Sequence, residues 1–140
     1  MKVVARACGD EVLVLEPIVH GDARGCFFEA FRADQLAALG LHGPWVQDNH
    51  SVSQAGVLRG IHFQWDEPQG KLVRVGRGRA LDVVVDLRHQ SPTFGTWKAF
   101  EIDAVKHHHM KETLKTTTDF VALGPTKSYR EDYDHWIRLF

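Results

Sequence analysis

The stretch Trp45–Gln64, WVQDNHSVSQAGVLRGIHFQ, predicts two neighbouring β-strands, Trp45–Ser53 and Val57–Gln64. Alternate side chains of an extended strand share a face, so the polar residues of the first strand gather on one side. They are Gln47, Asn49, Ser51 and Ser53. A polar row of this kind lines either a ligand or the solvated outer face of a sheet, and the pattern alone leaves both interpretations open.

The second strand places Arg59 and His62 on opposite faces if it is regular. Gly60 lies between them and is the residue type that permits a β-bulge. With a bulge, both side chains enter one cavity; without it, Arg59 is a surface charge. An imidazole suits proton removal near neutral pH because its unperturbed pKa is about 6.5, although a histidine in a strand is more often structural.

On both sides of this stretch, short strands recur at regular spacing, which predicts an all-β sandwich or barrel. The further expected strands are Val12–Val19, Phe27–Phe31, Lys71–Val75, Arg79–Leu87 and Thr93–Asp103. One short helix is expected over Ala33–Leu39, with Gly40 as its stop. Beyond Ala104 the periodicity is weak, and the expectations there are a helix near Met110–Leu114 and a terminal amphipathic piece over Tyr129–Phe140.

Alternation is clearest within Arg79–Leu87. One face carries Leu81, Val83, Val85 and Leu87, and the other carries Asp82, Val84 and Asp86.

Length and composition predict one globular domain over residues 1–140, since 44% of the residues are hydrophobic and 25% are charged. Lys and Arg number 17 against 18 Asp and Glu, and the net charge of -1 gives no general attraction for nucleic acid or an anionic membrane. No membrane-length apolar span appears, and Cys8 and Cys26 lack the spacing of metal ligands. A reduced, cytoplasmic setting is therefore expected.

Metal binding is not expected. His62-Phe63-Gln64 resembles the first metal motif of cupins, in which a His-x-His pair binds the ion, but Gln64 replaces the second histidine. An amide oxygen is a poor ligand for first-row metals compared with imidazole, so His62 is left available as an acid–base group. The run His107–His109 is interpreted as a solvated loop.

Three separated basic residues, Arg24, Arg59 and Lys71, suit a diphosphate, because guanidinium binds phosphate oxygens in bidentate fashion and ammonium acts as a point charge. For each of the three taken alone, a solvent-exposed position on the surface is the simpler interpretation than a contact with phosphate. Glu29 shares a face with Phe27 and Phe31, where it is either an edge charge or a hydrogen-bond acceptor for a stacked base.

Four segments together resemble the dTDP-4-dehydrorhamnose 3,5-epimerase family. They are DARGCFFEAF, QDNHSVSQAGVLRGIHFQ, QGKLVRV and LDVVVDLRHQSPTFGTW, and they cover a little over half of the chain in the family's order. The resemblance implies a cupin-type jelly-roll β-barrel with a minor helix, a homodimer, no cofactor, and a dTDP-linked 4-keto-6-deoxy sugar as substrate. In this reaction a base removes the protons at C3 and C5 beside the C4 ketone.

Carried over by position, the resemblance implies that His62 is the base and that Lys71 lies near the C4 oxygen. It also implies contacts with the nucleotide sugar from Arg24, Glu29, Gln47, Asp48, Asn49 and Arg59.

Residues 105–140 diverge from the family pattern, because neither the expected tyrosine acid nor the aspartate that orients the histidine is visible. Tyr129 and Tyr133 are the candidates to replace the acid, and Asp82 is the candidate to orient His62. Two alternatives to an epimerase remain. The tail SYREDYDHWIRLF resembles that of the sugar-nucleotide 3,4-ketoisomerases, and loss of the acid is also compatible with a non-catalytic cupin that binds nucleotide sugars.

Overall fold

A computed structural model describes residues 1–64, 69–104, 109–112, 116–124 and 133–139. The single helix in this part of the chain is α1 (Ala33–Ala38). The strands are β1 (Lys2–Ala7), β2 (Val12–Glu16), β3 (Val19–Asp22), β4 (Gly25–Phe28), β5 (Asp48–Gln54), β6 (Leu58–His62), β7 (Lys71–Arg77), β8 (Arg79–Asp86), β9 (Trp97–Asp103), β10 (His109–Glu112), β11 (Thr116–Gly124) and β12 (Tyr133–Leu139). The predicted all-β fold is confirmed.

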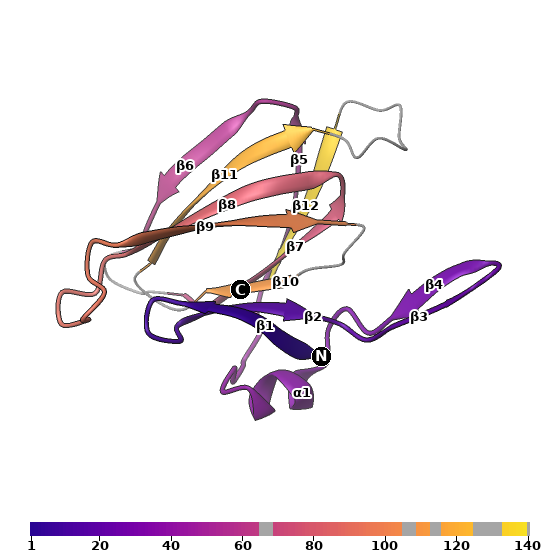
Figure 1. Ribbon diagram of the computed structural model, residues 1–140, viewed down its shortest axis with the longest axis horizontal. Helices are drawn as coiled ribbons and strands as arrows, with labels where there is room; N and C mark the ends of the chain where they lie inside the picture. Colours follow the sequence, from indigo (N-terminus) through magenta and orange to yellow (C-terminus); the bar gives the residue numbers. More distant parts are fainter. Residues whose placement is uncertain (65–68, 105–108, 113–115, 125–132, 140) are drawn as a thin grey trace.

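The strands form two facing sheets and a separate hairpin (Figure 1). The larger sheet has the order β1-β2-β10-β7-β12-β5, and the smaller has the order β6-β11-β8-β9. Among the described strands, β3 and β4 pair only with each other, and this hairpin projects to one side of the molecule as an arm (Figure 1). The chain crosses repeatedly between the two sheets, so strands distant in sequence lie side by side.

The main core lies between the two sheets. Val73 and Val75 of the larger sheet pack with Ala80, Val84 and Ile102 of the smaller one, and each is at most 5% exposed. Burial of each aliphatic side chain contributes roughly 1.5–3 kcal/mol, so this layer fixes which face of each strand is the inner one.

A second core covers the outer face of the larger sheet. Helix α1 places Leu36 against Leu13, Leu15 and Leu72. The helix ends at Ala38, one residue before the expected bound, and the predicted stop Gly40 follows the C-cap Leu39 with a φ of +81° that suits glycine. Strands β2 and β7 of the larger sheet are therefore buried on both faces, as their aliphatic runs require.

Strand β8 turns its acidic face inward. Asp82, Val84 and Asp86 are all 0% exposed, whereas Leu81 and Val83 on the other face are only half-buried. The alternating sequence of β8 is compatible with either face turned inward, so the packing of the strand in the sandwich decides its orientation.

The structure corrects one prediction in the C-terminal part. The helix expected near Met110–Leu114 is wrong, because His109–Glu112 is strand β10, paired with β2 on one side and β7 on the other. Two flanking ladders stabilise a four-residue strand that lacks alternation of its own. The terminal amphipathic piece contains strand β12, which lies between β5 and β7. No helix in the described part is long and apolar enough to cross a membrane.

Candidate functional site

The β-bulge that Gly60 permits is present. Thr118 of β11 pairs with His62 and Phe120 pairs with Arg59, so β6 uses three residues where β11 uses two. Gly60 has a φ of +132°, which a residue with a side chain rarely adopts. The extra residue rotates the strand, and Arg59 and His62 consequently share one face.

That face is the inner one. Thr118 also pairs with Val84, and Phe120 also pairs with Asp82, so all these positions share a side of the smaller sheet. Val84 belongs to the core between the sheets. His62 is the last residue of β6 and is exposed, which places the imidazole at an open end of the sandwich.

The larger sheet contributes Asn49 and Lys71 to the same interior. Arg138 of β12 pairs with Asn49 on one side and with the core residue Val73 on the other. Lys71 lies two residues before Val73 and shares its face. The loop from β6 to β7 joins His62 to Lys71, so both lie at the same end of the sandwich.

Hydrogen bonds hold three of the predicted contact residues on this face. Gln47 donates from Nε2 to Asn49 Oδ1 at 3.1 Å. Arg59 donates from Nε to Ser53 Oγ at 2.8 Å and from Nη2 to Val52 O at 3.3 Å. A guanidinium anchored in this way keeps donors for an anion, so the interior combines fixed cations with neutral hydrogen-bonding groups.

Asp48 does not share this face. Leu139 pairs with Asp48 and with Leu72, and Leu72 belongs to the core beneath α1. The register therefore turns Asp48 toward the outer side of the larger sheet.

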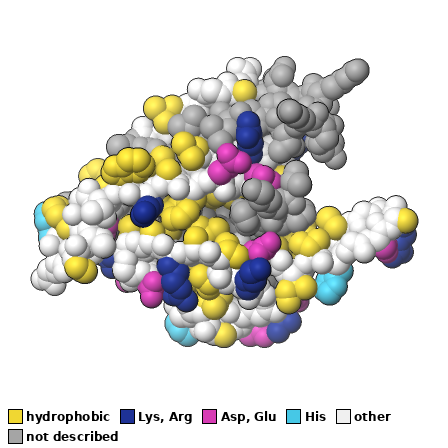
Figure 2. Space-filling view, viewed as in Figure 1, with side chains coloured by type: hydrophobic (Ala, Val, Ile, Leu, Met, Phe, Trp, Pro, Cys, Tyr) yellow, Lys and Arg dark blue, Asp and Glu magenta, His cyan; other side chains and the backbone are white. Residues whose placement is uncertain are grey.

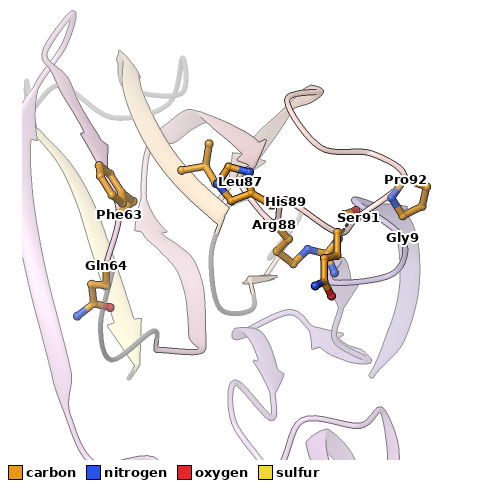
Figure 3. A pocket seen from close by; sticks show the side chains of 9 residues that line it. Gly9, Phe63, Gln64, Leu87, Arg88, His89, Ser91 and Pro92 are labelled. Atoms are coloured by element: carbon orange, nitrogen blue, oxygen red, sulfur yellow. Dashed lines mark hydrogen bonds between the residues drawn. The ribbon is translucent and has the colours of Figure 1, made fainter.

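A cavity of about 810 Å³ opens at the same end of the molecule (Figure 3). Phe63 and Gln64, which directly follow His62, form one wall. Arg88, His89 and the rest of the segment 87–92 form the other, with Gly9 beside them (Figure 3). None of the predicted catalytic or substrate-binding residues lines it, so the cavity extends the site beyond those residues.

The wall of this cavity is held by a buried carboxylate. Asp86 accepts hydrogen bonds from Arg88 N and Nε at 3.0 Å and Nη2 at 2.8 Å, from Ser91 Oγ at 2.7 Å and from Thr93 Oγ1 at 2.6 Å. Burial alone raises the pKa of Asp86, but these hydrogen bonds outweigh it and hold the pKa well below its usual value.

Arg88 ties this wall to the β1–β2 turn. Its Nη2 donates to Cys8 O at 2.6 Å, and its Nη1 lies 3.1 Å from Glu11 Oε1. The pKa of Arg88 is raised chiefly by Asp86, so the guanidinium stays charged. Sequence analysis missed this network, although the Asp-x-Arg spacing and the following Ser91-Pro92-Thr93 are a signal for side chains that cap a loop.

The two remaining predicted contact residues lie on or beside the arm, away from this interior. Arg24 lies in the β3–β4 turn and pairs with Asp22 at 2.6 Å, with 90% of its side chain exposed. Glu29 follows β4, lies 3.4 Å from Arg32 and accepts from Gln35 at 3.2 Å. Figure 2 shows basic and acidic side chains together at the tip of the arm.

Other predicted roles find no support in this geometry. Tyr133 begins β12 and pairs with Gln54, at the opposite end of the sandwich from His62. Tyr129 lies outside the described residues, as do His107 and His108. Where residues are described, no group of three or more His, Cys, Asp or Glu side chains has the arrangement of a metal site. Cys8 and Cys26 form no disulfide with each other.

Comparison with known proteins places the chain among sugar-nucleotide epimerases. A family model described as dTDP-4-dehydrorhamnose 3,5-epimerase matches residues 9–134. The enzyme of that name from Methanothermobacter thermautotrophicus is 52% identical over 91% of this chain and 74% of its own length. The Salmonella typhimurium enzyme is 48% identical over 74% of this chain, and the match spans only 58% of that relative.

A solved structure with the same described activity shares the fold. The Bacillus anthracis protein, with TDP and PPi bound, superimposes with a TM-score of 0.89 at 34% identity, over 99% of this chain and 75% of that one. The predicted cupin-type jelly roll is therefore confirmed.

Proposed function

The chain belongs to the dTDP-4-dehydrorhamnose 3,5-epimerase family, and from this premise we propose that it binds a dTDP-linked 4-keto-6-deoxy sugar and removes the protons at C3 and C5. The observation that carries the proposal is the bulge at Gly60, which brings Arg59 and His62 onto one inner face opposite Lys71. We assign His62 as the base that takes the proton from carbon.

The chemistry needs a stabilised enolate. Removal of a proton beside the C4 ketone moves the electron pair of the C–H bond toward the ketone oxygen, and a fixed cation there lowers the barrier. Lys71 is assigned this role because it lies on the inner face at the same end as His62. Proton transfer of this kind uses no redox group, so the proposal includes no cofactor.

Binding of the nucleotide part is assigned to Gln47, Asn49 and Arg59 within one chain. The Arg59 guanidinium is anchored on Ser53, and a charge-assisted hydrogen bond to a diphosphate contributes about 1.5–3 kcal/mol. Asp48 faces the other way and is left without a part in this assignment. Cysteines that are not joined in a disulfide fit a reducing compartment, and we retain the cytoplasm as the proposed location.

The arm supports a homodimer. Arg24 and Glu29 lie on or beside a hairpin that projects away from the sandwich, and the apolar Ile18 and Phe27 at its base are 65% and 70% exposed (Figure 1). Large apolar side chains at that level of exposure are typical of a contact surface. We infer that the arm of each subunit docks on a second copy, where Arg24 joins the ligand site of that copy.

The test of the reaction is NMR of dTDP-4-keto-6-deoxyglucose in D2O, with wild-type protein, His62→Asn and His42→Asn as a control in an exposed loop. Wild type and the control should incorporate deuterium at C3 and C5. His62→Asn should lose about 10²–10⁴-fold in exchange rate while its dTDP affinity, measured by calorimetry, stays close to wild type. Equal exchange by His62→Asn and wild type makes His62 a structural histidine.

The same spectra separate the alternative functions. A keto group moved to C3 indicates a ketoisomerase, and binding without exchange indicates a non-catalytic cupin. Exchange with little inversion is our expectation for this chain, because a base alone forms the enolate whereas inversion needs a proton from the opposite face. Absence of dTDP binding at millimolar concentration removes the nucleotide-sugar assignment altogether.

The shared site is tested by mixing variants. Arg24→Ala and His62→Asn should each be weak in exchange on their own. If Arg24 serves the site of a second copy, one subunit of each kind reconstitutes one intact site, and a mixture should recover a fraction of the wild-type rate. A mixture no faster than its two components, while sedimentation shows that mixed dimers form, contradicts the shared site.

A further inference from the structure

Arg88 joins the two sheets at the open end of the sandwich. Its Nε donates to Asp86 Oδ1 at 3.0 Å, and Asp86 is the last residue of β8 in the smaller sheet. Its Nη2 donates to Cys8 O at 2.6 Å and its Nη1 lies 3.1 Å from Glu11 Oε1, both in the turn that leads into β2 of the larger sheet. One guanidinium therefore binds both sheets through bonds of fixed direction.

In the smaller sheet, the anchor of Arg88 is close to the proposed base. His62 and Val84 both pair with Thr118 of β11, so they lie in one row with a single strand between them. Asp86 is the next inner position along β8, toward the end at which β6 also finishes. Since strands are about 4.8 Å apart, this anchor lies about 10 Å from the strand that carries His62.

The larger sheet repeats this arrangement around Lys71. Glu112 of β10 pairs with Lys71 on one side and with Val12 on the other. Val12 is the first residue of β2, and Glu11, which binds Arg88, directly precedes it. In each sheet, an anchor of Arg88 is thus two strands from a proposed catalytic residue.

The apolar core ends before this layer on β7 and β8. Val73 and Val84 belong to the core between the sheets. The next inner position toward the open end is Lys71 on β7 and Asp86 on β8. Apolar packing therefore sets the spacing of these strands up to Val73 and Val84, and the bonds of Arg88 hold it in the layer beyond.

The turn that Arg88 binds has an unusual backbone. Cys8, Gly9 and Asp10 have φ values of +52°, +63° and +71°, in a region that residues with side chains rarely adopt. Such conformations persist where the surrounding structure holds them. A Cβ at Gly9 would lie 3.9 Å from Arg88 Nη2, so the guanidinium lies directly against the turn (Figure 3).

We propose that Arg88 is a positioning residue for the reaction, because its link between the sheets sets the gap across which Lys71 faces His62. The inference rests on the proposed function, in which the base and the cation act on one sugar from opposite sheets. Arg88 itself touches no reacting atom. Its effect is geometric, and a misplacement of about 1 Å at a catalytic group can slow a reaction about 100-fold.

Proton exchange at C3 and C5 of dTDP-4-keto-6-deoxyglucose measures the effect of Arg88→Lys. Lysine keeps the charge, but its single ammonium lacks the fork that reaches both sheets. The exchange rate at saturating substrate should fall about 10–100-fold per dTDP-binding site, while dTDP affinity stays within about 3-fold of wild type. Counting the sites by calorimetry removes any loss of rate that is due to unfolded protein.

Arg6→Gln is the matched control. Arg6 also binds the β1–β2 turn, through Asp10 at 3.3 Å, but this pair lies within one hairpin, so the exchange rate should equal that of wild type. Glu11→Ala removes one anchor and leaves Asp86 its partner. It should slow exchange in the same direction as Arg88→Lys, and it tests the link even if Arg88→Lys does not fold.

A double variant separates positioning from a purely structural role. Lys71→Met should slow exchange about 10²–10³-fold in wild type but only about 10-fold in the Arg88→Lys protein, because an ammonium that is already displaced contributes less. Effects that multiply in the double variant contradict the inference, since they show that Arg88 acts independently of Lys71.

Crystal structures of wild type and of the folded variants measure the gap itself. The separation of the Cα atoms of His62 and Lys71 should change by about 1 Å. An unchanged separation, or an unchanged rate per site in the folded variants, overturns the inference. The separation is measured without turnover, so a wild type that shows no exchange refutes the proposed function while the gap still decides the role of Arg88.

Discussion

Replacement of Asp86 by asparagine should destabilise the fold by about 3 kcal/mol at pH 7. The carboxylate is 0% exposed and faces the guanidinium of Arg88, which is itself only 23% exposed. Removal of one partner of a buried ion pair costs roughly 3–5 kcal/mol. The lower end applies because Arg88 keeps Glu11 at 3.1 Å and the carbonyl of Cys8 at 2.6 Å.

The effect should shrink in acid. The pKa of Asp86 in the folded protein lies well below its usual value, and an unfolded aspartate titrates near 3.9. The stabilisation is therefore complete above about pH 4 and is lost as the pH falls toward the lowered pKa, because the unfolded chain takes up the proton first. At pH 3 the difference between wild type and Asp86→Asn should be about 1 kcal/mol smaller than at pH 7.

Urea unfolding at the two pH values measures both quantities. Asp34→Asn is the matched control, because Arg32 binds Asp34 with the same bidentate geometry at 2.7 and 2.8 Å, yet the carboxylate is 68% exposed. That pair should contribute no measurable stability, since exposed ion pairs are screened by solvent. Equal free energies of unfolding for Asp86→Asn and Asp34→Asn at pH 7 would show that the buried ion pair contributes no more stability than the exposed one, which contradicts the prediction.

Further predictions concern the site. Gly60→Ala should cost about 1–3 kcal/mol of stability from its backbone strain at φ +132° and should also weaken dTDP binding; Gly56→Ala, at φ +80° in a turn, should cost stability without affecting dTDP. Lys71→Met should slow exchange at C3 and C5 by about 10²–10³-fold, with Lys98→Met on the exposed edge strand unchanged. Exchange should survive exhaustive chelation, because Gln64 replaces a metal-binding histidine; a stoichiometric metal by elemental analysis, with activity lost on its removal, contradicts this.

Local sequence was sufficient to locate a possible bulge, but not to decide whether the strand adopts it. The glycine between Arg59 and His62 permits a bulge that would bring both side chains to one face, and the register of β6 with β11 contains this bulge. The orientation of β8 was not predictable in this way. Leu81 and Val83 alternate with Asp82 and Val84, and only the opposing sheet decides that the acidic face is the inner one.

The C-terminal strands were missed for a different reason. Residues His109–Glu112 have no alternation of their own and become a strand because β2 and β7 flank them. Pairing between segments this far apart in sequence is a tertiary effect, to which propensity and periodicity are insensitive. The network around Asp86 was missed similarly, because Arg88 reaches the carbonyl of Cys8, 80 residues away.

The two halves of the proposed reaction also differ in whether they depend on residues near in sequence or on segments far apart in the chain. Proton removal is assigned in our proposal to His62 and Lys71, which lie on the consecutive strands β6 and β7, and the bulge in β6 sets the face on which His62 lies. Inversion depends on an acid on the other side of the sugar, and Tyr133 lies at the opposite end of the sandwich from His62. An enzyme that keeps the first half without the second turns over protons without changing configuration. Deuterium at C3 and C5 should therefore accumulate faster than the epimerised product, and equal rates for the two would show that an acid acts beside His62 after all.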